Sequence, residues 1–384
     1  MIPTLTHLGQ LTVRQFMRRV WQRQPYLIRA AFAPNFSALR GADLLRLAQR
    51  PDVESRLVTH FKSAWRLYHG PLSRSQLPLR QPKNWTVLVQ GLDQIDPQVD
   101  ALLQRFRFIA DARLDDVMAS YAVPGGGVGP HTDSYDVFLL QAHGQRRWRI
   151  SQQTDTTCLD NVPLKLLARF TPTHEWTLHP GDMLYLPPGV AHEGVALTDC
   201  ITLSIGFRTP NWAQLAEPWL DQIAQRLSQT APYRDAKALP TRSPAQLPQA
   251  LLDETLARWK RMTPRPSDAR EALLQYLTEP KPNVVFQPLA RPLGRAGFTR
   301  ALANEGLGLA ASTRMLYSAG QIAINGELFT ARGPDLAALR QLANTRTLRT
   351  APDALSAPTL DWLYAAYQSA WISVHKKSSA RKSR

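Results

Sequence analysis

Residues 124–138 read Pro-Gly-Gly-Gly-Val-Gly-Pro-His-Thr-Asp-Ser-Tyr-Asp-Val-Phe, a glycine-rich turn that leads into an apolar run. The turn delivers His131 and Asp133, two residues apart, to the start of that run. Side chains at i and i+2 of an extended segment point to the same side, so both residues can reach one ion. The alternative is a pair of ordinary turn residues, with the aspartate accepting backbone hydrogen bonds.

A second block, residues 181–192, reads Gly-Asp-Met-Leu-Tyr-Leu-Pro-Pro-Gly-Val-Ala-His and predicts a strand, a tight turn and one more histidine. His131, Asp133 and His192 together have the ligand types of the 2-His-1-carboxylate triad, which holds Fe(II) and leaves coordination positions open. Zinc is the alternative ion for these side chains and would indicate hydrolysis or isomerisation. His179 is the alternative third ligand, although it precedes the strand and turn that should carry that ligand.

The stretch between residues 117 and 208 has the pattern of short strands separated by Gly and Pro turns, which indicates an antiparallel barrel or jelly roll. The glycines of the first block do not predict a phosphate loop, because no Gly-Lys-Ser/Thr follows and the next element is a predicted strand. The expected strands are 117–123, 137–141, 147–151, 183–186 and 200–207.

Residues 118–207 resemble the JmjC-type, cupin-like domain of 2-oxoglutarate-dependent oxygenases. Ser120, the run from Pro124 to Phe138, and the segment from Gly144 to Trp148 are similar to the bacterial ribosomal oxygenases, which hydroxylate an arginine of ribosomal protein sixteen of the large subunit. The resemblance covers the whole chain. It implies an α+β protein built on a JmjC-type double-stranded β-helix, with Fe(II) held by the catalytic residues His131, Asp133 and His192.

The resemblance also implies 2-oxoglutarate as cosubstrate, and the far carboxylate of that molecule needs a cation inside the barrel. Arg146 matches the family position for this cation, and its guanidinium can pair with a carboxylate through two hydrogen bonds. Ser120 is the expected hydroxyl donor to the same carboxylate. The alternative is that Arg146 is a surface residue, but alternation places Arg146 and Trp148 on one face and Arg147 and Arg149 on the other.

Three residues beside the predicted ligands have less definite roles. Tyr135 and Asp136 directly follow the metal pair, where contact with substrate and a place in the core or rim of the barrel remain equal alternatives. Glu193 follows a predicted ligand and should point away from the metal by alternation.

Composition sets the broad class of protein. The 384 residues allow two or three domains, and 44% hydrophobic residues exclude general disorder. Apolar runs stay below the ~18–20 residues of a membrane span, and the N-terminus lacks a signal-peptide pattern. Cys158 and Cys200 are too few for a disulfide framework, so we expect a cytoplasmic protein. The net charge of +16 indicates an acidic partner such as ribosomal RNA, or serves only solubility.

The N-terminal part, residues 1–60, is predicted to be mainly helical. Thr12 caps a first helix that ends before Pro25, a second helix covers 42–49, and a strand covers 84–90. We assign residues 1–210 to the oxygenase domain, with the barrel core at about 85–208.

Beyond Pro210 the pattern changes to helices. Apolar residues step by four from Leu215 to Leu227, a Pro-containing linker covers 231–248, and further helices follow up to residue 279. The resembling enzymes dimerise through this region, so residues 211–280 are the expected dimerisation region of a homodimer. An Asn325-Gly326 hairpin turn between helices predicts a winged-helix-like domain at 281–374. Residues 375–384 are a basic tail, predicted to be disordered and able to contact RNA phosphates.

We therefore interpret the chain as a 2-oxoglutarate-dependent dioxygenase of the protein arginine 3-hydroxylase type, acting on an arginine of a large-subunit ribosomal protein. Hydroxylation of a histidine in another ribosomal protein, or of an RNA base, is the alternative within the same chemistry. A non-catalytic ribosome- or RNA-binding factor is the alternative of another class. The three ligands and the carboxylate partner argue against that class, since a silent scaffold has no reason to keep them.

Overall fold

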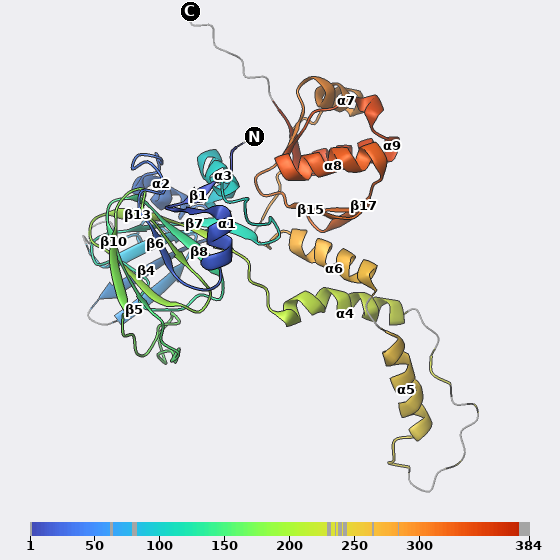
Figure 1. The fold of residues 1–384 in the computed structure, drawn as a ribbon, viewed down its shortest axis with the longest axis horizontal. Helices are drawn as coiled ribbons and strands as arrows, with labels where there is room; N and C mark the ends of the chain where they lie inside the picture. The colour runs from blue at the N-terminus through green and yellow to red at the C-terminus, as the bar shows by residue number, and fades with distance from the viewer. Residues whose placement is uncertain are drawn as a thin grey trace, which may run out of the picture. The chain divides into compact units, whose positions relative to one another are not determined.

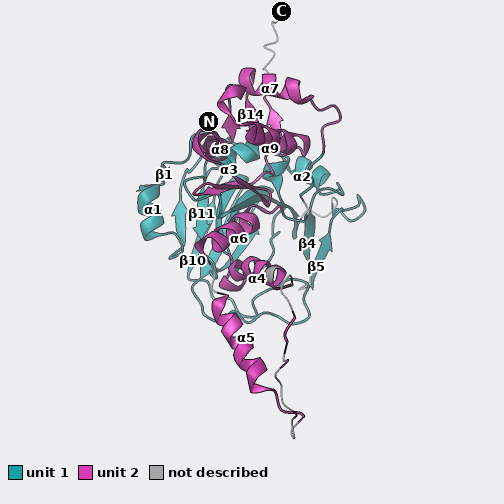
Figure 2. Ribbon diagram, turned by 90° about the vertical axis from the view of Figure 1, so that its right-hand side faces the viewer, with its two compact units in different colours: residues 1–209, 281–287 teal, residues 210–280, 288–384 magenta. Residues whose placement is uncertain are grey.

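The computed structural model describes the chain except residues 1, 62–63, 79–82, 229–231, 235, 237–239, 241–243, 263–264, 283 and 376–384 (Figure 1). The chain divides into two compact units: residues 1–209 with 281–287 form unit 1, and residues 210–280 with 288–384 form unit 2 (Figure 2). Most of the predicted basic tail and parts of the predicted linker at 231–248 lie outside the described residues. Among the described helices, none is long and apolar enough to span a bilayer.

Unit 1 is an antiparallel jelly roll of two facing sheets, which confirms the predicted fold class. The smaller sheet has the order β10-β9-β12, and the larger one has the order β3-β11-β8-β13-β7-β6-β4-β5. The strands are β3 (Tyr26–Ile28), β4 (Ser55–Phe61), β5 (Ala64–His69), β6 (Trp85–Val89), β7 (Leu114–Ala122), β8 (Asp136–His143), β9 (Arg146–Ser151), β10 (His174–Leu178), β11 (Met183–Leu186), β12 (Ala191–Ala196) and β13 (Cys200–Phe207).

Strand β8 shows how the two faces of the larger sheet are used. Val137 and Leu139 point between the sheets, where they pack with Trp148 of β9. Phe138 and Leu140 point to the outer face and join the main core. Because both faces are covered, the strand is apolar along most of its length instead of alternating with polar residues.

Helices cover the outer face of the larger sheet. Phe16 of α1 (Val13–Arg19) packs against Phe138 and Tyr185, with ring centroids 5.6 and 5.1 Å apart. Phe106, just after α3 (Pro97–Gln104), packs against Phe138 at 5.1 Å. This aromatic layer covers the outer face of the sheet, so that the inner face is left to form a site. The remaining elements of unit 1 are β1 (His7–Leu8), β2 (Leu11–Thr12), α2 (Gly41–Leu47) and η1 (Leu92–Gln94).

The N-terminal prediction is partly wrong. The two expected helices exist, and the Thr12 side chain caps α1 by accepting a hydrogen bond from the Gln15 backbone N–H. Residues 1–60 nevertheless also supply β1 and β2, which pair with each other, and β3 and β4, which join the larger sheet. Strand β3 has only three residues and pairs with β11, a contact that no local pattern reports.

Unit 2 contains a helical stretch and a domain of helices with a three-stranded wing. The hairpin turn is as predicted: Asn325 and Gly326 have φ values of 48° and 88° and connect β16 to β17. The helices and strands are α4 (Trp212–Ser228), α5 (Gln249–Arg261), α6 (Pro266–Thr278), α7 (Arg295–Asn304), β14 (Leu307–Leu309), β15 (Met315–Ser318), β16 (Gln321–Ile324), β17 (Glu327–Thr330), α8 (Gly333–Thr345), β18 (Thr347–Leu348), η2 (Pro352–Ala354), α9 (Ala357–Gln368) and β19 (Ile372–Val374).

Candidate metal centre

The glycine-rich turn before β8 folds back onto the start of β12. Gly125 and Gly129 both have a φ of 76°, which other residues rarely adopt. A Cβ atom on Gly127 would lie 2.4 Å from the backbone oxygen of Gly194, so this close approach also requires glycine. The turn thereby reaches the strand that carries the second histidine.

A backbone bridge fixes the two histidines side by side. The His131 N–H donates to the His192 oxygen at 3.0 Å, and the His192 N–H donates to the His131 oxygen at 2.9 Å. The Asp133 oxygen accepts a further bond of 2.8 Å from the Gly189 N–H, in the turn before β12. Backbone contacts alone therefore hold the three predicted ligand positions together.

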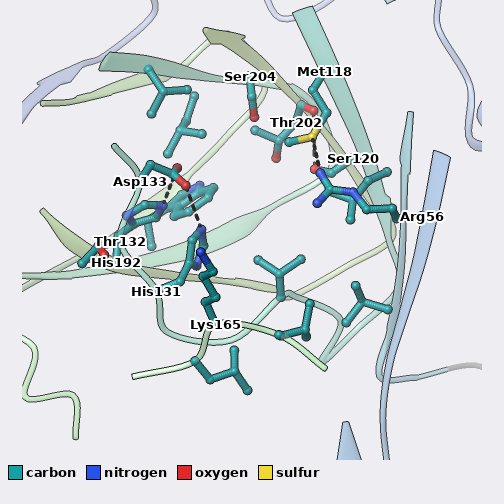
Figure 3. Close-up of a pocket in the computed structure, with 18 of the residues that line it drawn as sticks. Arg56, Met118, Ser120, His131, Thr132, Asp133, Lys165, His192, Thr202 and Ser204 are labelled. Atoms are coloured by element: carbon teal, nitrogen blue, oxygen red, sulfur yellow. Dashed lines mark hydrogen bonds and ion pairs between the residues drawn. The ribbon is translucent and has the colours of Figure 1, made fainter. Parts of the chain in front are cut away.

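The three side chains converge on one point, as Figure 3 shows. Asp133 Oδ1 lies 3.9 Å from His131 Nε2, and Asp133 Oδ2 lies 3.6 Å from His192 Nε2. All three ligand atoms lie within 4.8 Å of one another, and they are the one such cluster of His, Cys, Asp and Glu among the described residues. The set has the composition and spacing to hold a divalent metal ion.

Each histidine is oriented by its other ring nitrogen. His131 Nδ1 lies 2.9 Å from the Gly129 oxygen, and His192 Nδ1 lies 2.9 Å from the Val190 oxygen. A carbonyl oxygen can only accept, so Nδ1 carries the proton in both rings and Nε2 presents its lone pair to the site.

The charges at the three ligands also suit a metal. Burial, helped by the neighbouring His131, lowers the pKa of His192 to about 3, so that ring is neutral at neutral pH. Burial raises the pKa of the Asp133 carboxyl, although His131, the Tyr135 hydroxyl and Arg56 oppose this shift. Histidine binds metal as the neutral imidazole, and aspartate binds metal as the carboxylate, which a cation stabilises.

Arg146 is a buried cation on β9, with a side chain that points between the two sheets. Its Nη1 donates to Ser120 Oγ at 2.8 Å and to Thr202 Oγ1 at 3.3 Å, and its Nη2 donates to the Gly194 oxygen at 3.4 Å. Its Nε lacks a partner, and no carboxylate of a described residue pairs with it. Burial lowers the pKa of this guanidinium.

A buried guanidinium held by neutral groups alone is unfavourable by several kcal/mol, so the structure indicates that an anion completes this site. The surface alternative for Arg146 is wrong: Arg146 and Trp148 are buried, whereas Arg147 lies 4.0 Å from Glu175 and Arg149 pairs with Glu193. The same ion pair turns Glu193 away from the histidines.

One cavity of about 400 Å³ joins the triad to Arg146. In Figure 3, His131, Asp133 and His192 group on one side of the pocket, while Ser120 and Thr202 lie on another part of its wall. Val137, Leu139 and Trp148 also line it. The cavity can therefore hold a small dicarboxylate, with one end at a metal and the other at Arg146. Thr202 was not predicted, because nothing in its own strand distinguishes it from other core threonines.

A second recess, lined by acidic residues, opens beside the metal position. It shares Arg56, Met118, Asp133, Tyr135, Val137 and Ser204 with the first cavity and adds Glu54, Asp115 and Asp116. Asp116 is buried, and its Oδ2 accepts hydrogen bonds from Gln90 Nε2 at 2.7 Å and from the Gly91 N–H at 3.1 Å. These acidic residues were missed from the sequence, where Asp115-Asp116 has the pattern of a solvated pair.

The remaining candidates lie outside the site. His179 is not part of the cluster, and its backbone N–H donates to Asp182. Asp136 is a core residue: it accepts hydrogen bonds from the Tyr185 hydroxyl at 2.5 Å and from Gln22 Nε2 at 2.9 Å. Tyr135, in contrast, lines both cavities at their shared rim.

The chain is similar to two protein-family models and to ribosomal oxygenases of two bacteria. Residues 101–215 match the model of the JmjC domain, and residues 257–370 match that of the ROXA-like winged helix. The chain is 32% identical over 364 residues to the ribosomal protein uL16 3-hydroxylase of Escherichia coli, covering 93% of this chain and 96% of the relative. It is 38% identical over 212 residues to a probable ribosomal oxygenase of Haemophilus influenzae, covering 54% of this chain and 52% of the relative.

Solved structures agree with these sequence matches. An X-ray structure of E. coli YcfD superposes with a TM-score of 0.84 at 29% identity, covering 96% of this chain and all of that chain. A structure of the ribosomal oxygenase YcfD in complex with cobalt and 2-oxoglutarate superposes with a TM-score of 0.80 at 30% identity, covering 95% of this chain and 98% of that chain.

Proposed function

Because this chain belongs to the JmjC-domain ribosomal oxygenases, we propose that it is an Fe(II)- and 2-oxoglutarate-dependent hydroxylase of a large-subunit ribosomal protein. The observation that carries the proposal is the shared cavity, which places three metal-ligand side chains and an uncompensated buried Arg146 together. Within this class, we propose an arginine of uL16 as the target, after the protein for which the E. coli relative is named.

Each residue of the cavity has a defined task in this proposal. His131, Asp133 and His192 hold Fe(II) through Nε2, a carboxylate oxygen and Nε2. Arg146 binds the far carboxylate of 2-oxoglutarate, assisted by the hydroxyl of Ser120. When bound, Fe(II) with O2 and 2-oxoglutarate supplies the oxidation that converts a C–H bond to C–OH, with release of succinate and CO2. The apolar walls around the site exclude water from it.

The acidic recess supports arginine over the alternative substrates. Glu54, Asp115 and Asp116 line the same recess as Asp133, so a positively charged side chain is attracted to the position beside the metal. A neutral imidazole gains little from this field, and the phosphates of an RNA substrate are repelled by it. A guanidinium also has the planar donor arrangement that carboxylates bind with two hydrogen bonds.

We further propose a cytoplasmic homodimer that forms through the helical stretch within residues 211–280. Large apolar side chains on α4 and α5 are exposed, and patches of this kind mark interaction sites. They are Trp212, Leu220, Leu227, Leu252, Leu256 and Trp259.

The net charge of +16 supports an additional contact with ribosomal RNA. The division into an oxygenase domain at 1–210, a dimerisation region, and a winged-helix-like domain at 281–374 is part of the same proposal.

Mass spectrometry of uL16 tests the function directly. Ribosomes and free uL16 from cells that lack this protein are incubated with it, Fe(II), 2-oxoglutarate and O2. We expect a gain of one oxygen on a single arginine of uL16, and no gain with the His131→Ala variant. A gain on another residue would keep the chemistry and change the target. Succinate production without any gain would contradict a ribosomal substrate, and absence of succinate would contradict the oxygenase assignment itself.

A further inference from the structure

Lys281 already places a positive charge in the acidic recess. Its Nζ lies 2.8 Å from Asp115 Oδ1 and 3.7 Å from Asp116 Oδ1, and the residue lines the recess together with Asp133 and Tyr135. Lys281 begins the segment 281–287, which follows α6 and belongs to unit 1. An ammonium group of the chain itself thus sits where the proposed function requires the substrate cation.

We propose that Lys281 is an internal competitor for this position, which the substrate guanidinium displaces, and that the competition excludes side chains that bind the recess more weakly than arginine. The inference rests on the proposed function, because it takes the recess as the binding site of the target side chain. It adds a residue that sets how strongly a side chain must bind in order to occupy the recess, without taking part in the chemistry.

The selectivity follows from the difference between the two cations. A lysine that enters the recess exchanges one ammonium for another, and it competes against a group that is tethered at high effective concentration. An arginine brings a planar fork of donors that can bind two carboxylate oxygens at once, which an ammonium cannot do. Lys281 therefore lowers the apparent affinity of both side chains by the same factor, and only arginine has the additional contacts to bind in spite of it.

The carboxylates of the recess keep other partners when Lys281 leaves, and Arg56 also lines the recess. Asp115 Oδ1 also lies 3.4 Å from Arg208 Nε, and Asp116 keeps its hydrogen bonds from Gln90 and Gly91. The side chain of Lys281 is 31% exposed, so it has room to swing out toward solvent. Displacement of Lys281 is thus compatible with an intact fold, and so is its replacement by mutation.

The test compares two uL16 peptides that differ only in arginine or lysine at the hydroxylated position. Their binding to the full-length protein with 2-oxoglutarate and Mn(II) in place of Fe(II) is measured by fluorescence anisotropy. The variants are Lys281→Met, Lys281→Arg and the control Lys83→Met, which removes the same charge from an exposed residue of unit 1 that lines neither cavity. Thermal unfolding checks that all variants are folded.

We expect the wild-type protein to bind the arginine peptide more tightly than the lysine peptide. In Lys281→Met both peptides should bind more tightly by a similar factor of about threefold to tenfold, so that the arginine preference is kept at higher affinity. Lys281→Arg should weaken the binding of both peptides, because an internal guanidinium is the stronger competitor. Lys83→Met should keep the wild-type affinities.

Two results would overturn the inference. Unchanged or weaker binding of both peptides to Lys281→Met would show that Lys281 does not compete with the substrate. Binding of neither peptide to the wild-type protein would refute the proposed function, and the role of Lys281 with it. Succinate release by the same preparation separates these cases, since it reports the metal site without reference to the recess.

Discussion

Arg146 shows how a single buried side chain reveals a missing ligand. Its guanidinium is buried, it is held by two hydroxyls and a carbonyl oxygen, and its Nε is without a partner. The burial of such a charged group without an anion is unfavourable in free energy. The binding of a carboxylate removes this penalty. Arg146 therefore lowers the stability of the protein without 2-oxoglutarate, and its pairing with the carboxylate stabilises the complex.

The variant Arg146→Met is expected to separate these two effects. It should raise the KM for 2-oxoglutarate at least tenfold, because the far carboxylate loses its charged partner. The melting temperature of the ligand-free protein should stay the same or rise, because an uncompensated buried charge is removed. Succinate assays and calorimetry measure the two quantities. Arg147→Met, on the outward face of β9, should leave the KM unchanged, and a similar loss there would contradict the assignment of Arg146.

A second prediction at the residue scale concerns Asp116 in the acidic recess. The variant Asp116→Asn keeps the size of the side chain and removes its charge, so it should lower kcat/KM for the uL16 substrate about tenfold to a hundredfold. The KM for 2-oxoglutarate should not change, because Asp116 lines the recess and not the cavity of Arg146. If Asp116→Asn changed kcat/KM for uL16 and the KM for 2-oxoglutarate by the same factor, the cause would be structural damage instead of lost substrate binding.

Among the individual residues, the sequence could predict the ligands but not the recess. His131 and Asp133 lie in one short motif, and alternation alone placed Arg146 on the same face as Trp148. Asp116 faces the metal position only because β4, β7 and the segment around Lys281 meet there. That meeting depends on contacts between distant segments, and no local pattern encodes it.

At the scale of elements, strand pairing decides which segments become strands where the sequence pattern alone does not predict them. Apolar strands with long pairings, such as β8 and β13, were predicted close to their observed bounds. Strand β12 was not, because Ala-His-Glu-Gly-Val-Ala has little apolar alternation. Its Gly194 is required by packing: a Cβ atom there would lie 2.7 Å from the Trp148 ring and 2.9 Å from Arg146 Nε.

Asp182 ties β3 to the turn before β11 and gives this connection a pH dependence. Burial disfavours its charged form, but N–H donors of His179 and Ala30 and the Arg29 guanidinium outweigh burial and lower its pKa. A lowered folded pKa means that the stabilisation is complete above the unfolded pKa near 3.9 and is lost as the pH falls through the folded value.

The variant Asp182→Asn should therefore lower the free energy of unfolding by about 1–2 kcal/mol at pH 7, since a charged acceptor is replaced by a neutral one. The difference between wild type and variant should shrink as the pH falls below about 4. Urea unfolding at a series of pH values measures this. Asp52→Asn, an exposed aspartate in a surface pair with Arg50, serves as the control and should have little effect at any pH. A pH-independent difference at Asp182 would contradict the charge argument.

At the scale of the whole molecule, unit 2 exposes more apolar surface on its helices than a protein without a partner needs. The exposed fraction is 87% for Trp212 on α4 and 61% for Trp259 on α5. Tryptophan is the residue type that most often dominates the energy of protein–protein contacts. These side chains lie in the stretch to which the family resemblance assigned dimerisation, so the exposed surface supports the same proposal.

The variant Trp259→Glu is therefore expected to shift the protein from dimer to monomer and to raise the dimer dissociation constant at least tenfold, because a charge replaces a large apolar contact. Analytical ultracentrifugation over a range of concentrations measures this constant. Lys260→Glu alters charge at the neighbouring position of the same helix without removing apolar surface, and it should leave the dimer largely intact. Succinate release that persists in the Trp259→Glu monomer would show that the metal site is complete within one chain, as the geometry of unit 1 implies. A wild-type protein that sediments as a monomer would remove the basis for the dimer and assign the exposed apolar face to a different partner.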